Sequence, residues 1–180
     1  MASWVGRMIG AARLDAATYE EVEADVGANG QALGVVLLSA VAAGIGGAGR
    51  GGHGLFVGII MALFGWVIWA FLIWLVGTKL LPEPETKSDV GELLRTTGFA
   101  ASPGLLRVFA WIPVLGVAVN VGVWAWMLAT MVVAARQALD YRSTGRAIAV
   151  CAIGFGAQML VAFFFGALMG AALMHVWRMP

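Results

Sequence analysis

Five long apolar runs dominate this sequence and constrain its fold more than any other feature. They cover about residues 31–49, 55–78, 92–112, 114–138 and 146–174. A helix needs roughly 20 residues to cross the ~30 Å hydrocarbon core of a bilayer, and each run is near that length. The joints between the runs are mostly short, so consecutive helices must be antiparallel neighbours. The pattern predicts an all-α, polytopic membrane bundle with about five transmembrane helices.

Charged side chains are too few to coat a soluble protein of this size. They make up 12% of the 180 residues, and 61% of the residues are hydrophobic, whereas a soluble domain carries roughly 25% charged residues. Lipid must therefore cover much of the surface. The net charge of +1 excludes a strongly basic nucleic-acid binder, and the single cysteine, Cys151, excludes an intrachain disulfide.

Residues 1–30 are more polar and form a separate N-terminal segment, followed by a membrane domain over 31–180. A helix over 3–13 would gather apolar residues on one face, with Trp4 as an interfacial anchor and with Arg7 and Arg13 off that face. A second short helix follows Asp15. The first apolar run begins only at Gln31, which is late for a cleavable signal peptide. We expect that run to be retained as the first span.

The charges favour a cytoplasmic N-terminus and an outside C-terminus. In that orientation eight of the eleven Lys and Arg residues lie inside, as the positive-inside rule requires. The reverse orientation would place them outside. All ten Asp and Glu residues also fall on the cytoplasmic side, within 15–25, 83–92 and at Asp140. The outer face is therefore expected to have no carboxylate.

Four stretches, in their order and spacing, resemble stretches of a known family. They are 13–23, 91–104, 112–116 and 136–147. Together they resemble the bacterial branch of the YIP family, five-span membrane proteins with a cytoplasmic N-terminus, named for eukaryotic members that interact with Rab-type GTPases. The resemblance implies a five-span fold and a multi-pass location in the bacterial inner membrane. It implies little about activity.

The residues that could carry catalysis do not converge. His53 and His175 are both expected on the outer side, where no acid can orient them, and Cys151 lies near the cytoplasmic end of the fifth run. The two histidines could in principle bind a soft metal with nearby methionines, but their spacing matches no known motif. We therefore predict no enzymatic activity, no cofactor and no metal site.

The cytoplasmic helix ends carry a denser group of charges. Glu92 and Arg95 are one helical turn apart, as are Arg136 and Asp140, and Arg142 and Arg146 follow in a polar turn. We expect Glu92 or Asp140 to pair with an arginine on another helix. Such pairs would stabilise the inner rim of the bundle. The alternative is a docking surface for a partner protein or for anionic head groups.

Arg107 is the most unusual charge, because it lies about five residues from the outer end of its run, or ~8 Å deep. Asn120 is expected at a similar depth on the next span. The guanidinium could snorkel to the surface. It could also bond Asn120 and the carbonyls freed by Pro103, or bind a lipid phosphate.

Small residues recur four apart, at Ala42 and Gly46 in the first run and at Gly166 and Gly170 in the fifth. This spacing lets helix backbones approach closely, and we favour packing within the chain over a homo-oligomer. The overall prediction is a non-enzymatic membrane protein with an organisational role, binding membrane lipids or other membrane proteins. The alternatives are an accessory subunit of a respiratory or photosynthetic complex, and a small permease or channel. The polar side chains within the spans, Asn120, Gln158 and Arg107, are too few to line a path for transport.

Overall fold

The computed structural model describes residues 2–47 and 54–176, with side chains up to residue 168, and every regular element in these ranges is helical. The α-helices are α1 (Trp4–Ala12), α2 (Ala16–Ala24), α3 (Asn29–Gly47), α4 (Leu55–Leu75), α5 (Val90–Ala100), α6 (Leu115–Ala138) and α7 (Thr144–Val176). Three further helical elements are not α-helices: the 3-10 turn η1 (Val26–Ala28), the π-helical turn η2 (Val76–Leu80) and the 3-10 segment η3 (Ser102–Trp111). The predicted all-α bundle is confirmed.

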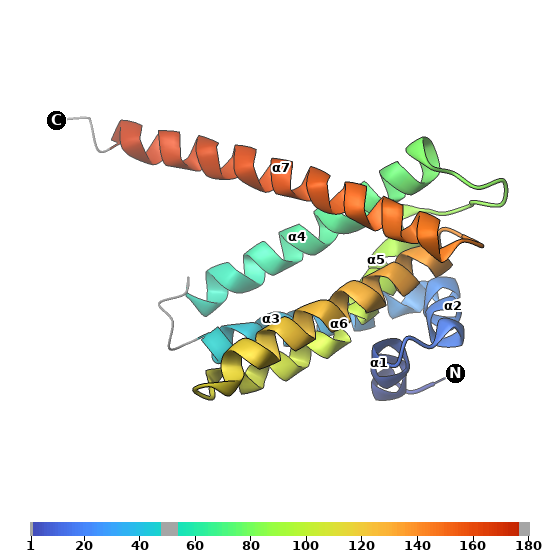
Figure 1. The fold of residues 1–180 in the computed structure, drawn as a ribbon, viewed down its shortest axis with the longest axis horizontal. Coiled ribbons are helices and arrows are strands. Elements are labelled where there is room, and N and C mark those ends of the chain that lie inside the picture. The colour runs from blue at the N-terminus through green and yellow to red at the C-terminus, as the bar shows by residue number, and fades with distance from the viewer. Residues whose placement is uncertain (1, 48–53, 177–180) are drawn as a thin grey trace.

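Four helical segments are long and apolar enough to cross a membrane. They are Val26–Gly47, Leu55–Leu80, Leu115–Ala138 and Thr144–Leu168. The fifth expected span, 92–112, is not a single helix, so the count of five is not confirmed. Figure 1 shows that α5 and η3 nevertheless run the length of the bundle between the ends of α4 and α6, in the same direction as α3.

Pro103 explains why the segment is broken. Proline has no N–H to donate and its ring clashes with the carbonyl four residues earlier, so an α-helix ends before it. That carbonyl belongs to Phe99, and the Ser102 hydroxyl donates to it at 2.6 Å. The bond keeps a buried acceptor paired where the backbone leaves the α-helix for η3.

The irregular segment η3 packs closely along α3. A Cβ on Gly46 would lie 2.0 Å from the carbonyl oxygen of Arg107, and one on Gly104 would lie 2.0 Å from the Ser39 hydroxyl. Ala42, one turn before Gly46, is buried. The small residues of the first run therefore pack within the chain, as predicted, whereas a Cβ on Gly166 in α7 would meet no described atom within 4 Å.

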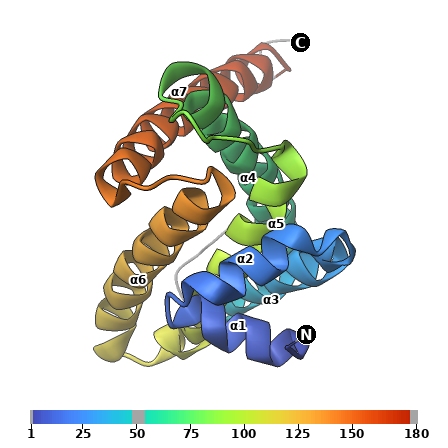
Figure 2. The ribbon, with the colours of Figure 1, turned by 90° about the vertical axis from the view of Figure 1, so that its right-hand side faces the viewer.

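The N-terminal helices share a hydrophobic core with the bundle. Ala11, Tyr19 and Val22 are fully buried with residues of α3, α5 and α6. The Tyr19 hydroxyl donates to the Ala11 carbonyl at 3.0 Å, and Asp15 caps the start of α2. Trp4 is partly exposed, and its indole N–H donates to the Gln31 carbonyl at 3.2 Å, so this side chain packs on the start of α3. Val5 and Ile9 form the exposed apolar face of α1. Helix α1 packs mainly on α5 and η3, and α2 packs mainly on α5 and α6; Figure 2 shows the two helices side by side at one end of the bundle.

The helix α7 diverges from the other helices toward its C-terminal end (Figure 1). Its first turns are packed, since Ala147 and Val150 are fully buried, but Met159 and Phe163 are mostly exposed. This divergence leaves a wide groove between α7 and the helices α3, α4 and α6.

Candidate functional site

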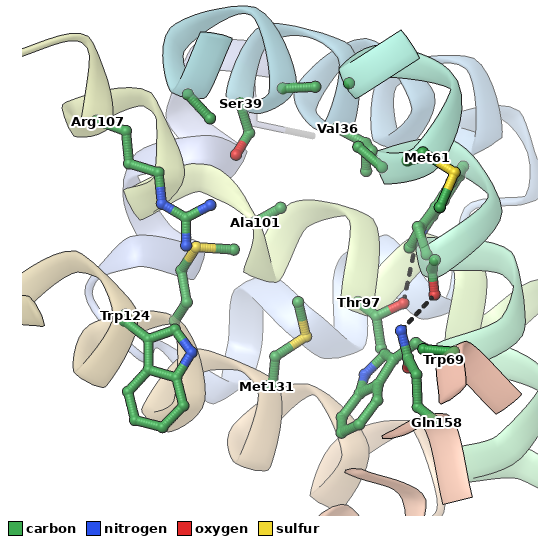
Figure 3. Close-up of a pocket in the computed structure, with 18 of the residues that line it drawn as sticks. Val36, Ser39, Met61, Trp69, Thr97, Ala101, Arg107, Trp124, Met131 and Gln158 are labelled. Carbon is green, nitrogen blue, oxygen red and sulfur yellow. Dashed lines mark hydrogen bonds between the residues drawn. The ribbon is translucent and has the colours of Figure 1, made fainter. Parts of the chain in front are cut away.

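The large groove, here called the main groove, is a half-open cavity of about 960 Å³. Side chains of α3, α4, α6 and α7 line it, together with Thr97 of α5 and Arg107 of η3. Most of the lining is aliphatic, aromatic or methionine. Figure 3 shows Arg107 at one end of the main groove and Thr97, Trp69 and Gln158 at the other, with Val36, Ala101 and Met131 between them.

Arg107 is half-buried and its guanidinium points into the main groove, on the side where Ser39 and Trp124 also lie (Figure 3). Within the described part of the chain, no group accepts a hydrogen bond from it and no acid pairs with it. The lining around it is largely apolar. A permanent charge therefore faces a space that can admit a ligand.

The alternative that Arg107 bonds Asn120 is wrong. The Asn120 amide donates to the Gly116 carbonyl in its own helix, at 2.8 Å, and Asn120 does not line the main groove. Gly116 lies one turn before Asn120 on α6, so this bond forms within the helix and does not depend on how the helices pack.

Hydrogen bonds between helices occur at the other end of the main groove. The Trp66 indole N–H donates to the Thr97 hydroxyl at 3.2 Å, which joins α4 to α5. The Gln158 amide donates to the Gly65 carbonyl at 3.3 Å, which joins α7 to α4 (Figure 3). These two bonds hold α4, α5 and α7 together at this end of the main groove.

A second cavity, of about 620 Å³, lies at the helix ends expected to be cytoplasmic; we call it the rim cavity. Four of the predicted site residues meet there: Glu92, Arg136, Asp140 and Arg142. The sequence did not indicate the other acids that join them, which are Glu20, Glu23 and Glu85. Arg95 and Arg146, the other two residues expected at this rim, do not line the cavity.

The expected pairing of Glu92 or Asp140 with arginine is wrong for the described residues. Glu92 caps α5 instead, since its carboxylate accepts from the Asp89 amide at 3.0 Å and the Asp89 carboxylate accepts from the Glu92 amide at 2.9 Å. This reciprocal capping box follows from an aspartate and a glutamate three residues apart, a signal present in the sequence. Asp140 has a φ of 53° and turns the chain after α6.

Two arginines in and just after the α6–α7 turn, Arg142 and Arg146, pair with acids of the loop before α5. Arg142 forms an ion pair with Glu85, and Arg146 pairs with Glu83 at 3.5 Å. The loop folds over the α6–α7 turn, and this long-range contact was missed because neither acid is close in sequence to its partner. Arg142 and Glu85 are well exposed, so this pair adds little stability.

Arg95 and Arg136 bind backbone carbonyls rather than carboxylates. The buried Arg95 side chain donates to the Glu23 carbonyl at 3.1 Å, at the C-terminal turn of α2. Arg136 donates to the Tyr141 carbonyl at 3.2 Å. Cations favour the C-terminal end of a helix dipole. Arg95 therefore fixes α2 against α5.

The sequence analysis missed a buried ionic cluster around Arg7. The Arg7 side chain is 2% exposed and pairs with Glu21 at 3.0 Å and with Asp25 at 2.8 Å. It also donates to the Gln31 amide oxygen at 3.1 Å. The available signal was the position of Arg7 off the apolar face of α1, followed by an acidic helix. The cluster joins α1, α2 and the start of α3.

Glu23 is a titratable group of the rim cavity. Burial, and then the charges of Glu92 and Asp140, raise its pKa from 4.5 to about 7. As pH rises from about 4.5 to above 7, the carboxyl group loses its proton more easily in the unfolded chain than in the folded one. Folding stability contributed by this group therefore falls through that window.

We expect Glu23→Gln to be more stable than the wild type at pH 8 and close to it at pH 4, where Glu23 is mostly protonated in both states. Allowing for its partial exposure, the gain at pH 8 should be about 1 kcal/mol, or roughly 3 °C in Tm. Thermal unfolding in detergent at the two pH values measures it. An equal gain at both would show that ionisation of Glu23 is not the cause.

The structure describes only some of the residues on which the prediction of no metal site depends. His53 and the side chain of His175 lie outside the described residues. Among the residues that are described, no group of three or more His, Cys, Asp or Glu side chains could hold a metal ion.

Comparisons of the chain with protein-family models, curated proteins and solved structures found no match. The class of protein therefore rests on the fold and on the composition of its helices. Four long apolar helices define a membrane-embedded helical protein, with a half-open groove in the bundle and a polar cavity at one end.

Proposed function

We propose that this protein is a non-enzymatic, five-crossing protein of the bacterial inner membrane that holds an anionic phospholipid in the main groove. The observation that carries the proposal is the Arg107 guanidinium, which faces a largely apolar groove with no acid or hydrogen-bond acceptor among the described residues. The role that we propose for such a protein is organisational and depends on the bound lipid.

A lipid phosphate fits the chemistry of this site. Arginine keeps its charge at any ordinary pH, so deprotonation cannot neutralise it. The guanidinium can bind phosphate through two parallel hydrogen bonds. The aliphatic, aromatic and methionine side chains that line the rest of the main groove suit acyl chains. One amphiphile therefore satisfies both the charge and the apolar surface.

The proposal of a fifth crossing is supported by the length and packing of α5 and η3. At 1.5 Å per α-helical residue and 2.0 Å per 3-10 residue, the two segments extend roughly 35 Å, enough for a ~30 Å core. Irregular backbone is tolerated at membrane depth where protein covers it, and Pro103, Gly104 and Ala110 of η3 are buried. The resemblance to YIP proteins favours the same topology.

The lipid proposal predicts that Arg107→Gln retains several-fold less phosphatidylglycerol than the wild type after purification in mild detergent. The substitution removes the charge but keeps a polar side chain of similar reach. Native mass spectrometry measures the fraction of protein that carries lipid. Unchanged retention would contradict a phosphate at Arg107.

Arg142→Gln is the matched control, because it removes one positive charge outside the main groove from a residue already paired with Glu85. We expect lipid retention close to that of the wild type. An equal loss in both variants would indicate nonspecific attraction of anionic lipid to a cationic protein.

A further inference from the structure

Two buried polar atoms lack a hydrogen-bond partner in the described part of the chain. They are the indole nitrogen Nε1 of Trp69 and the amide oxygen Oε1 of Gln158. Both residues line the main groove. A buried polar group without a partner costs roughly 1–3 kcal/mol, so two in one place point to a missing ligand group.

The two residues lie near the same contact between α4 and α7. Gln158 donates to the Gly65 carbonyl, one turn before Trp69 on α4. A Cβ on Gly154, one turn before Gln158 on α7, would lie 3.8 Å from the Trp69 ring. Figure 3 shows both side chains at the end of the main groove away from Arg107. The unpartnered donor and acceptor thus belong to one level of the groove.

The chemistry of the two atoms specifies the missing group. The Trp69 N–H can only donate a hydrogen bond, and the Gln158 oxygen can only accept one. A hydroxyl group is small and does both, accepting from Trp69 and donating to Gln158. We infer that the main groove selects a lipid whose acyl chain carries a hydroxyl group at this level. The inference rests on the proposed function, since Arg107 would hold the head group of the same molecule.

A ligand must move neighbouring side chains to reach these atoms, because both atoms are buried beneath other protein atoms. Four methionines line the main groove: Met61, Met127, Met131 and Met159. Methionine is unbranched and adapts its shape easily. The lining can therefore open toward the polar pair without displacement of a helix.

The test compares two lysophosphatidylglycerols with stearoyl chains that differ only in a hydroxyl group near the middle of the chain. The full-length protein in detergent is offered an equimolar mixture, and native mass spectrometry gives the ratio of the two bound forms. We expect about fivefold preference for the hydroxylated lipid, as one buried hydrogen-bonding group provides.

Trp69→Phe and Gln158→Met each remove one partner of the hydroxyl and keep most of the side-chain volume. Both should bring the ratio close to one. Trp69→Phe should melt at or above the Tm of the wild type, because it removes an unpartnered buried polar atom. Gln158→Met also loses the hydrogen bond to the Gly65 carbonyl, so its Tm should be close to or below that of the wild type. Arg107→Gln should lower the binding of both lipids and leave the ratio unchanged.

The outcomes separate the two proposals. A ratio near one in the wild type, or a preference that persists in both Trp69→Phe and Gln158→Met, overturns the hydroxyl inference. If Arg107→Gln still weakens binding of both lipids, the proposed lipid site stands without it. If the wild type binds neither lipid better than Arg107→Gln does, the proposed function fails and the inference fails with it.

Discussion

Arg7→Met is expected to lower the free energy of unfolding by about 3 kcal/mol. The Arg7 side chain is 2% exposed and pairs with both Glu21 and Asp25. Its removal leaves two neighbouring carboxylates, and the Gln31 amide oxygen, without their common cation. The partner acids remain partly exposed, which places the expected loss at the lower end for a broken buried pair. Thermal unfolding in detergent, followed by circular dichroism, measures it.

Arg13→Met is the control on the same segment, because Arg13 is exposed just after α1. A surface substitution of this kind should change stability by less than about 0.5 kcal/mol. If the two variants melt alike, the ionic cluster does not hold α1 and α2 on the bundle. Limited proteolysis adds a local readout, since loss of the cluster should expose the chain around Asp15 to cleavage.

Gly46→Ala is expected to destabilise the protein by about 3 kcal/mol or more. The added Cβ would lie 2.0 Å from the carbonyl oxygen of Arg107 and 3.0 Å from the Cβ of Ala110. A backbone oxygen cannot rotate away as a side chain can, so α3 and η3 must separate. Because η3 carries Arg107, the same substitution should also reduce lipid retention in the native mass spectrometry assay.

Gly30→Ala provides the comparison on the same helix. A Cβ there meets no described atom within 4 Å, and alanine favours a helix over glycine by up to about 1 kcal/mol. We expect stability equal to or above that of the wild type. Equal losses at positions 30 and 46 would mean that the contact between α3 and η3 is looser than the structure shows.

The close contact of Gly46 also shows what a local sequence pattern can and cannot predict. The small residues of α3, four apart, indicated a helix face built for close approach. The partner is η3, a segment with irregular backbone whose position depends on the break at Pro103. The spacing of small residues describes one surface and carries no information on the surface that packs against it.

The charged residues show the same limit. The sequence placed Glu92, Arg136, Asp140 and Arg142 at one end of the bundle, and the structure gathers them in the rim cavity. Their individual bonds were not predictable in the same way. The capping box of α5 was a local signal that competed with the expected ion pair, and local bonds form without the entropy cost of closing a long loop.

Length and hydropathy alone determined that the chain is α-helical and embedded in a membrane, because a lipid-facing backbone must satisfy its own hydrogen bonds and a helix does so within one segment. Only the tertiary structure decided where Arg7 finds its acids, why Asn120 does not reach Arg107, and that Trp69 and Gln158 face one groove. These contacts join residues distant in sequence, and they depend on helix crossing and on the divergence of α7. No periodicity within a single helix contains that information.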